Sequence, residues 1–321
     1  MDEIERQSAL RAVFMGTPDF AAETLRGLAA WDGCELVGVY TQPDRPCGRG
    51  RQCTPSPVKV LALELGVPVF QPENFKSAEA VAELAALRPD VLVVAAYGLI
   101  LPQAVLDVPR LMPVNVHASL LPRYRGAAPI QRCIQNGDEI TGTTIMRMEA
   151  GLDTGPILLQ RALRIGYEQH AGQLHDELAA QGGAMIVEAL ERLQRGALRE
   201  LAQDDSLATY AAKLRKEEGL VDWNRPVREI HNQIRAMHPW PGAYYFWEHR
   251  GETLRLGILP GRPGRALSPG EAAPGTILGQ EEGLLAIACA DGVYLSSGVK
   301  PQGRKEMDAT AFCCGYLNVC A

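Results

Sequence analysis

Apolar and polar positions along the first two thirds of the chain predict alternating strands and helices. Short apolar runs predict strands at 12–15, 36–40, 67–70, 90–94, 113–117, 142–148 and 157–163, and helical spacing predicts helices at 58–65, 78–87, 127–136 and 171–195. The run that begins at Asp90 is continuously apolar after its first residue, as expected of a strand buried on both faces. The pattern therefore predicts an α/β fold, doubly wound, with a mostly parallel sheet.

The pattern changes towards the C-terminus. After a polar stretch comes one helix at 227–237, and then short strands between glycine and proline turns at 243–247, 253–259, 275–278, 284–288 and 292–296. Five short strands with such punctuation predict a small C-terminal β-barrel, OB-like in type. We therefore predict a catalytic domain at 1–195, a linker at 196–215 and a barrel domain at 216–321, because 321 residues exceed what one core usually organises.

Composition narrows the class of protein. Hydrophobic residues make up 46% and charged residues 22%, which is ordinary for a globular chain, and no apolar run approaches the roughly 20 residues that span a bilayer. The first eleven residues lack the features of a secretory or transit peptide. We therefore expect a cytoplasmic protein with no membrane contact.

Cysteine spacing and net charge argue against a metal-binding, a disulfide-linked and a generally nucleic-acid-binding protein. The eight cysteines form no CxxC pair and have no histidine at zinc-ligand spacing, so we expect neither a metal site nor a disulfide framework. The net charge of −6 argues against a surface that grips nucleic acid everywhere. Residues 211–321 are nearly neutral, however, with 13 basic against 12 acidic side chains, which leaves room for a local basic face.

The strand at 113–117 carries two polar side chains on one face. Asn115 and His117 are two residues apart and point the same way, whereas Val114 and Val116 point into packing. The pair could be a core histidine and a strand-end amide whose hydrogen bonds are satisfied internally. It could instead donate hydrogen bonds to an oxyanion, since ligands of open α/β sheets bind beyond the carboxyl ends of strands.

Two loops carry further candidate groups. Asp153 lies between two glycines in the sequence GLDTG, as either a turn-forming aspartate or a carboxylate brought close to a ligand. The loop at 45–51 holds three arginines, either as a solvated charge cluster or as an anion or RNA contact. No GxGxxG or Walker A sequence occurs, which argues against a nucleotide cofactor.

Taken in order, these motifs resemble those of a known family. The run NVHASLLPRYRG at 115–126, followed by GLDTG, resembles the signature of the folate-dependent formyltransferases. The sequences FMGTPDF, TQPDRPCGRG, AAYGLILP, GAAPIQR, KLRKEEGLVDW and HPWPGA extend the resemblance over about residues 11–305. A formyltransferase of Rossmann-like fold is therefore expected.

The resemblance also implies an activity and its residues. The formyl group of 10-formyltetrahydrofolate would pass to the amino group of methionine on initiator tRNA, with no metal and no protein partner required. Asn115, His117 and Asp153 match the family's catalytic positions. Folate binding is implied for two segments, which contain Ser119, Leu120, Leu121 and Pro122 in one and Tyr97, Gly98 and Leu99 in the other. Arg49 matches the loop that contacts the 3′ end of the tRNA, and the barrel matches the family's tRNA-binding domain.

Two other classes stay open. The chain could be a related folate enzyme that formylates a sugar-nucleotide amine or hydrolyses formylfolate, or a noncatalytic RNA-binding module. Three converging polar groups argue against the module, since binding alone does not need them. The basic loop and the predicted barrel favour a tRNA substrate over a sugar.

Overall fold

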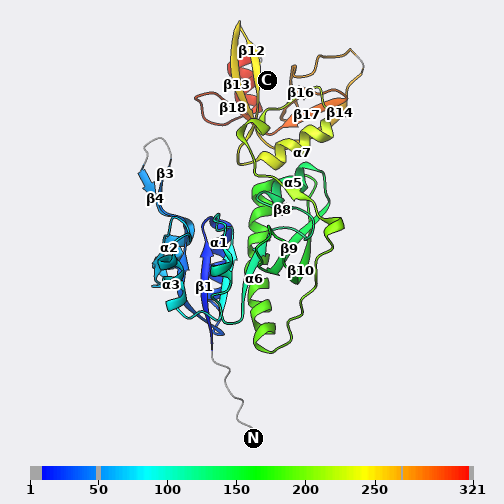
Figure 1. Cartoon of the computed structure of the whole chain (residues 1–321). Helices are drawn as coiled ribbons and strands as arrows, with labels where there is room; N and C mark the ends of the chain where they lie inside the picture. Colours follow the sequence, from blue (N-terminus) through cyan, green and yellow to red (C-terminus); the bar gives the residue numbers. More distant parts are fainter. Residues whose placement is uncertain (1–8, 48–51, 269, 318–321) are drawn as a thin grey trace. The chain divides into compact units, whose positions relative to one another are not determined.

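The computed structural model describes residues 9–47, 52–268 and 270–317, and the chain divides into two compact units (Figure 1). The first unit comprises Met1–Gly126, Gly142–Leu163 and His175–Tyr210, and the second comprises Ala127–Thr141, Arg164–Leu174 and Ala211–Ala321. The predicted domain limits at 195 and 216 stay a prediction. The segment 196–210, predicted as part of a linker, belongs to the first unit.

A seven-stranded sheet forms the centre of the first unit. Its strands lie in the order β10-β9-β7-β6-β1-β2-β5. Their bounds are β1 Leu10–Gly16, β2 Cys34–Tyr40, β5 Val69–Phe70, β6 Val91–Ala95, β7 Met112–His117, β9 Ile140–Arg147 and β10 Ile157–Arg164. The pairs β1–β2, β1–β6, β2–β5 and β6–β7 are parallel, whereas β9 runs antiparallel to β7.

Helices cover both faces of this sheet. The bounds are α1 Asp19–Ala29, α2 Pro57–Glu64, α3 Ala78–Ala86, α4 Gln103–Leu106 and α6 Ala171–Gln194. Leu84 of α3 and Val105 of α4 share one buried cluster with Val13, Leu92 and Val94 of the strands. On the other face α6 approaches β7 so closely that a Cβ on Gly182 would lie 2.8 Å from a methyl carbon of Val116. The predicted doubly wound α/β fold is confirmed.

Two short strands lie along the sequence on either side of residues 48–51, which are outside the described residues. Strand β3 (Arg45–Cys47) pairs with β4 (Gln52–Thr54), where the sequence had predicted only a loop. Ser56 then caps α2, its side chain accepting a hydrogen bond from the backbone N–H of Lys59 at 3.1 Å. Arg49 lies outside the described residues.

The second unit contains two four-stranded antiparallel sheets. Their orders are β12-β13-β18-β19 and β14-β17-β16-β15. The bounds are β12 Ala243–His249, β13 Glu252–Ile258, β14 Gly261–Ala266, β15 Ile277–Glu281, β16 Leu284–Ala288, β17 Gly292–Ser296, β18 Gly298–Pro301 and β19 Met307–Asp308. The remaining described elements are β8 Arg125–Gly126 of the first unit, β11 Tyr210–Ala211, helices α5 Pro129–Gln135, α7 Val227–Met237 and α8 Ala309–Phe312, and the short helices η1 Asp205–Leu207, η2 Lys216–Gly219 and η3 Cys313–Leu317.

One hydrophobic core joins both of these sheets to α7. It includes Tyr245 and Leu256 of the first sheet, Leu285 and Tyr294 of the second, and Ile230 of the helix. The sequence predicted a small, OB-like β-barrel here, and the structure confirms a C-terminal domain of antiparallel strands. Strands β14 and β18 were not predicted, because the sequences GRPGRA and GVKP show no regular apolar alternation.

Candidate active site

Strand β7 presents two polar side chains where the sheet changes direction. It is parallel to β6 on one side and antiparallel to β9 on the other, and Asn115 is paired with Val94 and His117 with Thr144. His117 is buried, with 6% of its surface exposed, and Asn115 is half-buried. The predicted placement of both groups at the carboxyl end of the strand agrees with the structure.

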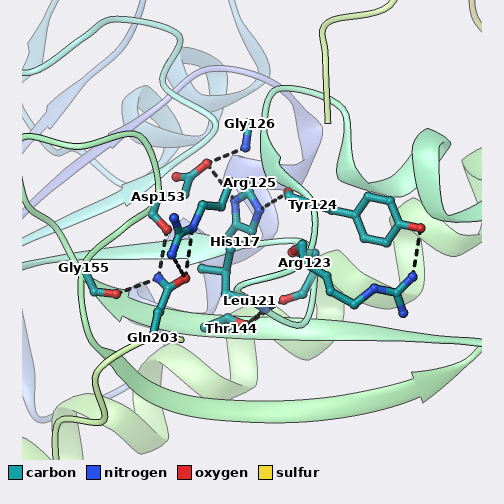
Figure 2. A network of polar contacts seen from close by, with 11 residues as sticks. His117, Leu121, Arg123, Tyr124, Arg125, Gly126, Thr144, Asp153, Gly155 and Gln203 are labelled. Carbon is teal, nitrogen blue, oxygen red and sulfur yellow. Dashed lines mark hydrogen bonds and ion pairs between the residues drawn. The ribbon is translucent and has the colours of Figure 1, made fainter. Parts of the chain in front are cut away.

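The histidine ring is oriented by a backbone carbonyl (Figure 2). Nε2 of His117 lies 2.9 Å from the carbonyl oxygen of Tyr124, and because a carbonyl only accepts, Nε2 is the donor. The other ring nitrogen, Nδ1, lies 3.7 Å from Oδ2 of Asp153. The same Oδ2 accepts a hydrogen bond from the backbone N–H of Gly126 at 2.7 Å.

The loop that carries Asp153 is tightly built. Asp153 itself has a φ of 53°, in the left-handed region that few residues other than glycine adopt. A Cβ on Gly155 would lie 2.0 Å from the carbonyl oxygen of Arg147, and one on Gly151 would lie 2.2 Å from the Thr154 hydroxyl. The two flanking glycines thus permit the close backbone approach that the sequence predicted.

Asn115 differs from its neighbours in having a free amide. Among the described residues, no hydrogen bond joins the Asn115 side chain to another group. The amide can therefore donate to a bound molecule without breaking an internal hydrogen bond. His117 and Asp153 lie 3.7 Å apart, and Asn115 lies on the same face of β7 as His117; the catalytic roles that the resemblance implies for all three are a proposal.

Sequence reasoning missed a fourth polar residue at this site. Nε2 of Gln203 donates to the carbonyl oxygens of Asp153 and Gly155 at 2.8 and 2.7 Å (Figure 2). Its Oε1 accepts two hydrogen bonds from the Arg125 guanidinium, which also pairs with Asp205. No periodicity or motif marks Gln203, because it lies in the polar stretch that was predicted to be a linker.

The segment 119–122 turns two of its four side chains inward. Ser119 is fully buried and its hydroxyl donates to the Arg123 carbonyl at 2.7 Å, while Leu121 is 3% exposed. Leu120 and Pro122 are half-buried. Any ligand contact by this segment would therefore involve Leu120, Pro122 or the backbone.

The loop 97–99 follows β6 at the same edge of the sheet. The Tyr97 ring is 2% exposed and belongs to the core, where burial raises the pKa of its phenol. Its carbonyl oxygen accepts hydrogen bonds from Thr17 and Gln42. Gly98, with a φ of 82°, forms the turn, so the backbone rather than the tyrosine ring is open to a ligand.

The described residues show neither a metal-binding cluster nor a membrane-spanning helix. No group of three or more histidine, cysteine, aspartate or glutamate side chains in this part of the chain is placed to hold a metal ion. Among the same residues, no helix is both long and apolar enough to cross a membrane.

Sequence comparison defines the family. Residues 10–190 match the formyl transferase family, and residues 213–317 match the formyl transferase C-terminal domain. The chain belongs to the formyl transferase family, which confirms the resemblance seen in the sequence.

Individual relatives are similar over nearly the whole chain. A methionyl-tRNA formyltransferase of Nitratidesulfovibrio vulgaris is 57% identical, over 97% of this chain and 94% of the relative. A methionyl-tRNA formyltransferase of Pseudomonas fluorescens is 51% identical, over 93% and 91% of the two chains.

Solved structures share the fold at low identity. HypX from Aquifex aeolicus in complex with tetrahydrofolic acid has a TM-score of 0.63 and 16% identity, over 98% of this chain and 48% of that one. An N-formyltransferase from Helicobacter canadensis, in complex with folinic acid and dTDP-3-aminofucose, has a TM-score of 0.62 and 16% identity, over 93% and 100%. At this identity the likeness establishes the fold alone.

Proposed function

We propose that this protein transfers the formyl group of 10-formyltetrahydrofolate to the amino group of methionyl-initiator tRNA, giving N-formylmethionyl-tRNA. The observation that carries the proposal is the approach of His117 to Asp153, at 3.7 Å, with Asn115 on the same face of β7 at the carboxyl edge of the sheet. Two relatives named methionyl-tRNA formyltransferase, at 57% and 51% identity, support the choice of acceptor.

In the proposed reaction, Asn115 and His117 stabilise the developing oxyanion. The neutral amine of the methionyl group attacks the formyl carbon, and negative charge develops on the formyl oxygen. The amide of Asn115 and Nδ1–H of the positively charged His117 ring, whose Nε2–H is bonded to the Tyr124 carbonyl, donate hydrogen bonds to that oxygen. The carbon–nitrogen bond to N10 of the folate then breaks, N10 takes up a proton, and the new amide nitrogen loses one.

Asp153 supplies the negative charge of the site. Its carboxylate faces Nδ1 of His117 at 3.7 Å and stabilises positive charge on the ring while the oxyanion exists. It also serves as an acceptor for the proton that leaves the attacking amine. The substrate amine is itself the nucleophile, so the reaction requires no activated serine or cysteine.

We propose that the loops after β6 and β7 hold the folate. In the first loop, Gly98 and Leu99 offer backbone groups beside the buried Tyr97 ring. In the second, the half-buried Leu120 and Pro122 offer apolar contacts, with Ser119 and Leu121 supporting the turn from inside. The half-buried side chains are thus proposed to contact the folate, and the buried ones to hold the loops in place.

We propose that different parts of the chain carry out catalysis and tRNA binding. Residues 1–195 carry catalysis and residues 216–321 bind the tRNA; of the segment 196–215, predicted as a linker, residues 196–210 belong to the first unit. Arg49, in the basic loop at 45–51, contacts the 3′ end. A guanidinium is suited to this role because it pairs with phosphate in two-pronged geometry.

The experiment that tests this function compares acceptors. The protein is incubated with 10-formyltetrahydrofolate and either methionyl-initiator tRNA or a dTDP-amino sugar, and the formylated product is followed. We expect formylmethionyl-tRNA and no formyl sugar. Transfer to the sugar alone, or release of formate without transfer, would establish the second class of enzyme, and binding of tRNA without turnover would indicate a noncatalytic module.

A further inference from the structure

We infer that Gln203 is a positioning residue that holds the Asp153 loop in its reactive geometry. This inference rests on the proposed role of Asp153 in formyl transfer. The Gln203 amide donates to the carbonyl oxygens of Asp153 and Gly155, at 2.8 and 2.7 Å (Figure 2). One side chain therefore fixes the backbone on both sides of Thr154, next to the residue that carries the carboxylate.

The Arg125 guanidinium determines which way the Gln203 amide points. A guanidinium can only donate, so the oxygen of Gln203 must face it, with Nε and Nη2 at 3.1 and 2.8 Å. The amide nitrogen must then face the two loop carbonyls. Only 12% of the Arg125 side chain is exposed, and its charge is balanced by Asp205, whose oxygen lies 2.7 Å away.

In the segment 201–210 the large apolar side chains are exposed, whereas the polar Gln203 is half-buried. Leu201, Leu207 and Tyr210 are 66, 61 and 65% exposed. A segment docked by the hydrophobic effect would turn its leucines inward. This segment is instead held by hydrogen bonds, and Gln203 directs its polar group towards the Asp153 loop.

The same segment is anchored on both sides of Gln203. Leu201 exchanges two backbone hydrogen bonds with Ile157, the first residue of β10, at 2.9 and 2.8 Å. At the other end, the Thr209 hydroxyl accepts from the backbone N–H of Tyr124, whose carbonyl orients the ring of His117. Gln203 thus lies between two anchors, one at the start of β10 and one at Tyr124, the residue that orients His117.

The Asp153 loop is one that external support would be expected to stabilise. Asp153 adopts a left-handed backbone conformation, which persists only where surrounding contacts enforce it. Without Gln203, the carboxylate keeps its hydrogen bond to Gly126 but loses the restraint on the backbone behind it. A displacement on the order of 1 Å can cost a reaction 10²-fold in rate.

Two substitutions separate this role from general stability. Gln203→Ala removes the whole amide, and Gln203→Glu keeps the size and the acceptor for Arg125 but deletes both donated hydrogen bonds. We expect kcat for methionyl-tRNA to fall by roughly 10- to 100-fold in both variants, with KM for folate and tRNA within about twofold of the parent. Gln194→Ala is the matched control, because Gln194 also donates to a backbone carbonyl, that of Gly33 at the opposite end of the strands.

A double-variant cycle distinguishes positioning from structure. If Gln203 acts through Asp153, adding Gln203→Glu to Asp153→Asn lowers the single-turnover rate no further. An equal loss in both backgrounds, or a kcat unchanged in Gln203→Glu, would overturn the inference. If Gln203→Ala fails to fold, Gln203→Glu still decides. Failure of the proposed function is separate, since the parent protein would then transfer no formyl group to methionyl-tRNA.

Discussion

At the scale of single residues, the three polar groups of the site differ in how the fold commits them. His117 uses Nε2 on the Tyr124 carbonyl, and Asp153 uses one oxygen on the Gly126 N–H. Asn115 makes no side-chain hydrogen bond to another described residue, so its amide can donate to a bound molecule without losing an internal partner. Hydrogen bonds to the backbone therefore orient the imidazole of His117 and the carboxylate of Asp153, whereas none with a described residue orients the Asn115 amide.

This difference yields a prediction for Asn115→Ala. The substitution should lower kcat on the order of 10²- to 10³-fold, because one oxyanion donor is lost. Thermal stability should change little, since no described partner is left unsatisfied. Steady-state kinetics beside a thermal melt checks both parts, and a kcat within twofold of the parent would remove Asn115 from the oxyanion site.

Residue-level prediction from the sequence succeeded where a pattern existed. Asn115 and His117 were found because their spacing along a strand places them on one face. Asp153 could be joined to them only through the family resemblance, since its contact with His117 spans 36 residues of chain. Gln203 was missed because its partners lie about 50 and 80 residues away, and hydrogen bonds at such separation leave no local signal.

At the scale of elements, strands buried on both faces were predicted most accurately. The continuous apolar run of β6 predicted a central strand, and β16 and β17 begin and end at the predicted residues. The antiparallel direction of β9 was not predictable, because an apolar run carries no information on its partner's direction. Strand β14 forms by pairing with β17 despite its glycine and proline residues.

An ion pair joins two elements of the second unit and should make its stability depend on pH. The hydrogen bond from Arg132 of α5 lowers the pKa of the Glu218 carboxyl below its usual value. A carboxyl with a depressed folded-state pKa contributes stability that is present above its unfolded pKa, near 4.5, and is lost as pH falls through the folded value.

Glu218→Gln should therefore destabilise the second unit at pH 7 by about 1–2 kcal/mol and much less at pH 3. Urea unfolding followed by tryptophan fluorescence suits the measurement, since three of the four tryptophans (Trp223, Trp240 and Trp247) lie in this unit. A difference between parent and variant that stays constant from pH 7 to pH 3 would contradict the assigned ion pair.

At the scale of the whole molecule, the protein has a net negative charge, yet its proposed substrate, tRNA, is also negatively charged. The net charge of −6 requires that attraction to tRNA be local, and the arginine-rich segment at 45–51 is the densest basic stretch of the first unit's sequence. Strand β3, at the start of this segment, pairs in antiparallel register with β4, which follows it; residues 48–51 lie outside the described residues.

We expect Arg49→Ala to weaken tRNA binding and to flatten its salt dependence. Loss of one phosphate contact should reduce the slope of log K against log salt by about one. Filter binding from low to moderate salt measures the slope, with Arg192→Ala on α6 as a control that removes a charge paired with Glu188. Parallel lines for parent and Arg49→Ala would show that Arg49 touches no phosphate.

The most direct test of the catalytic assignment is the single-turnover rate of formyl transfer to methionyl-tRNA by Asp153→Asn. Asparagine keeps the size of the side chain but removes the charge that faces His117. We predict a rate lower by roughly 10²- to 10⁴-fold, with folate and tRNA bound as tightly as by the parent. A transfer rate equal to that of the parent would contradict the account.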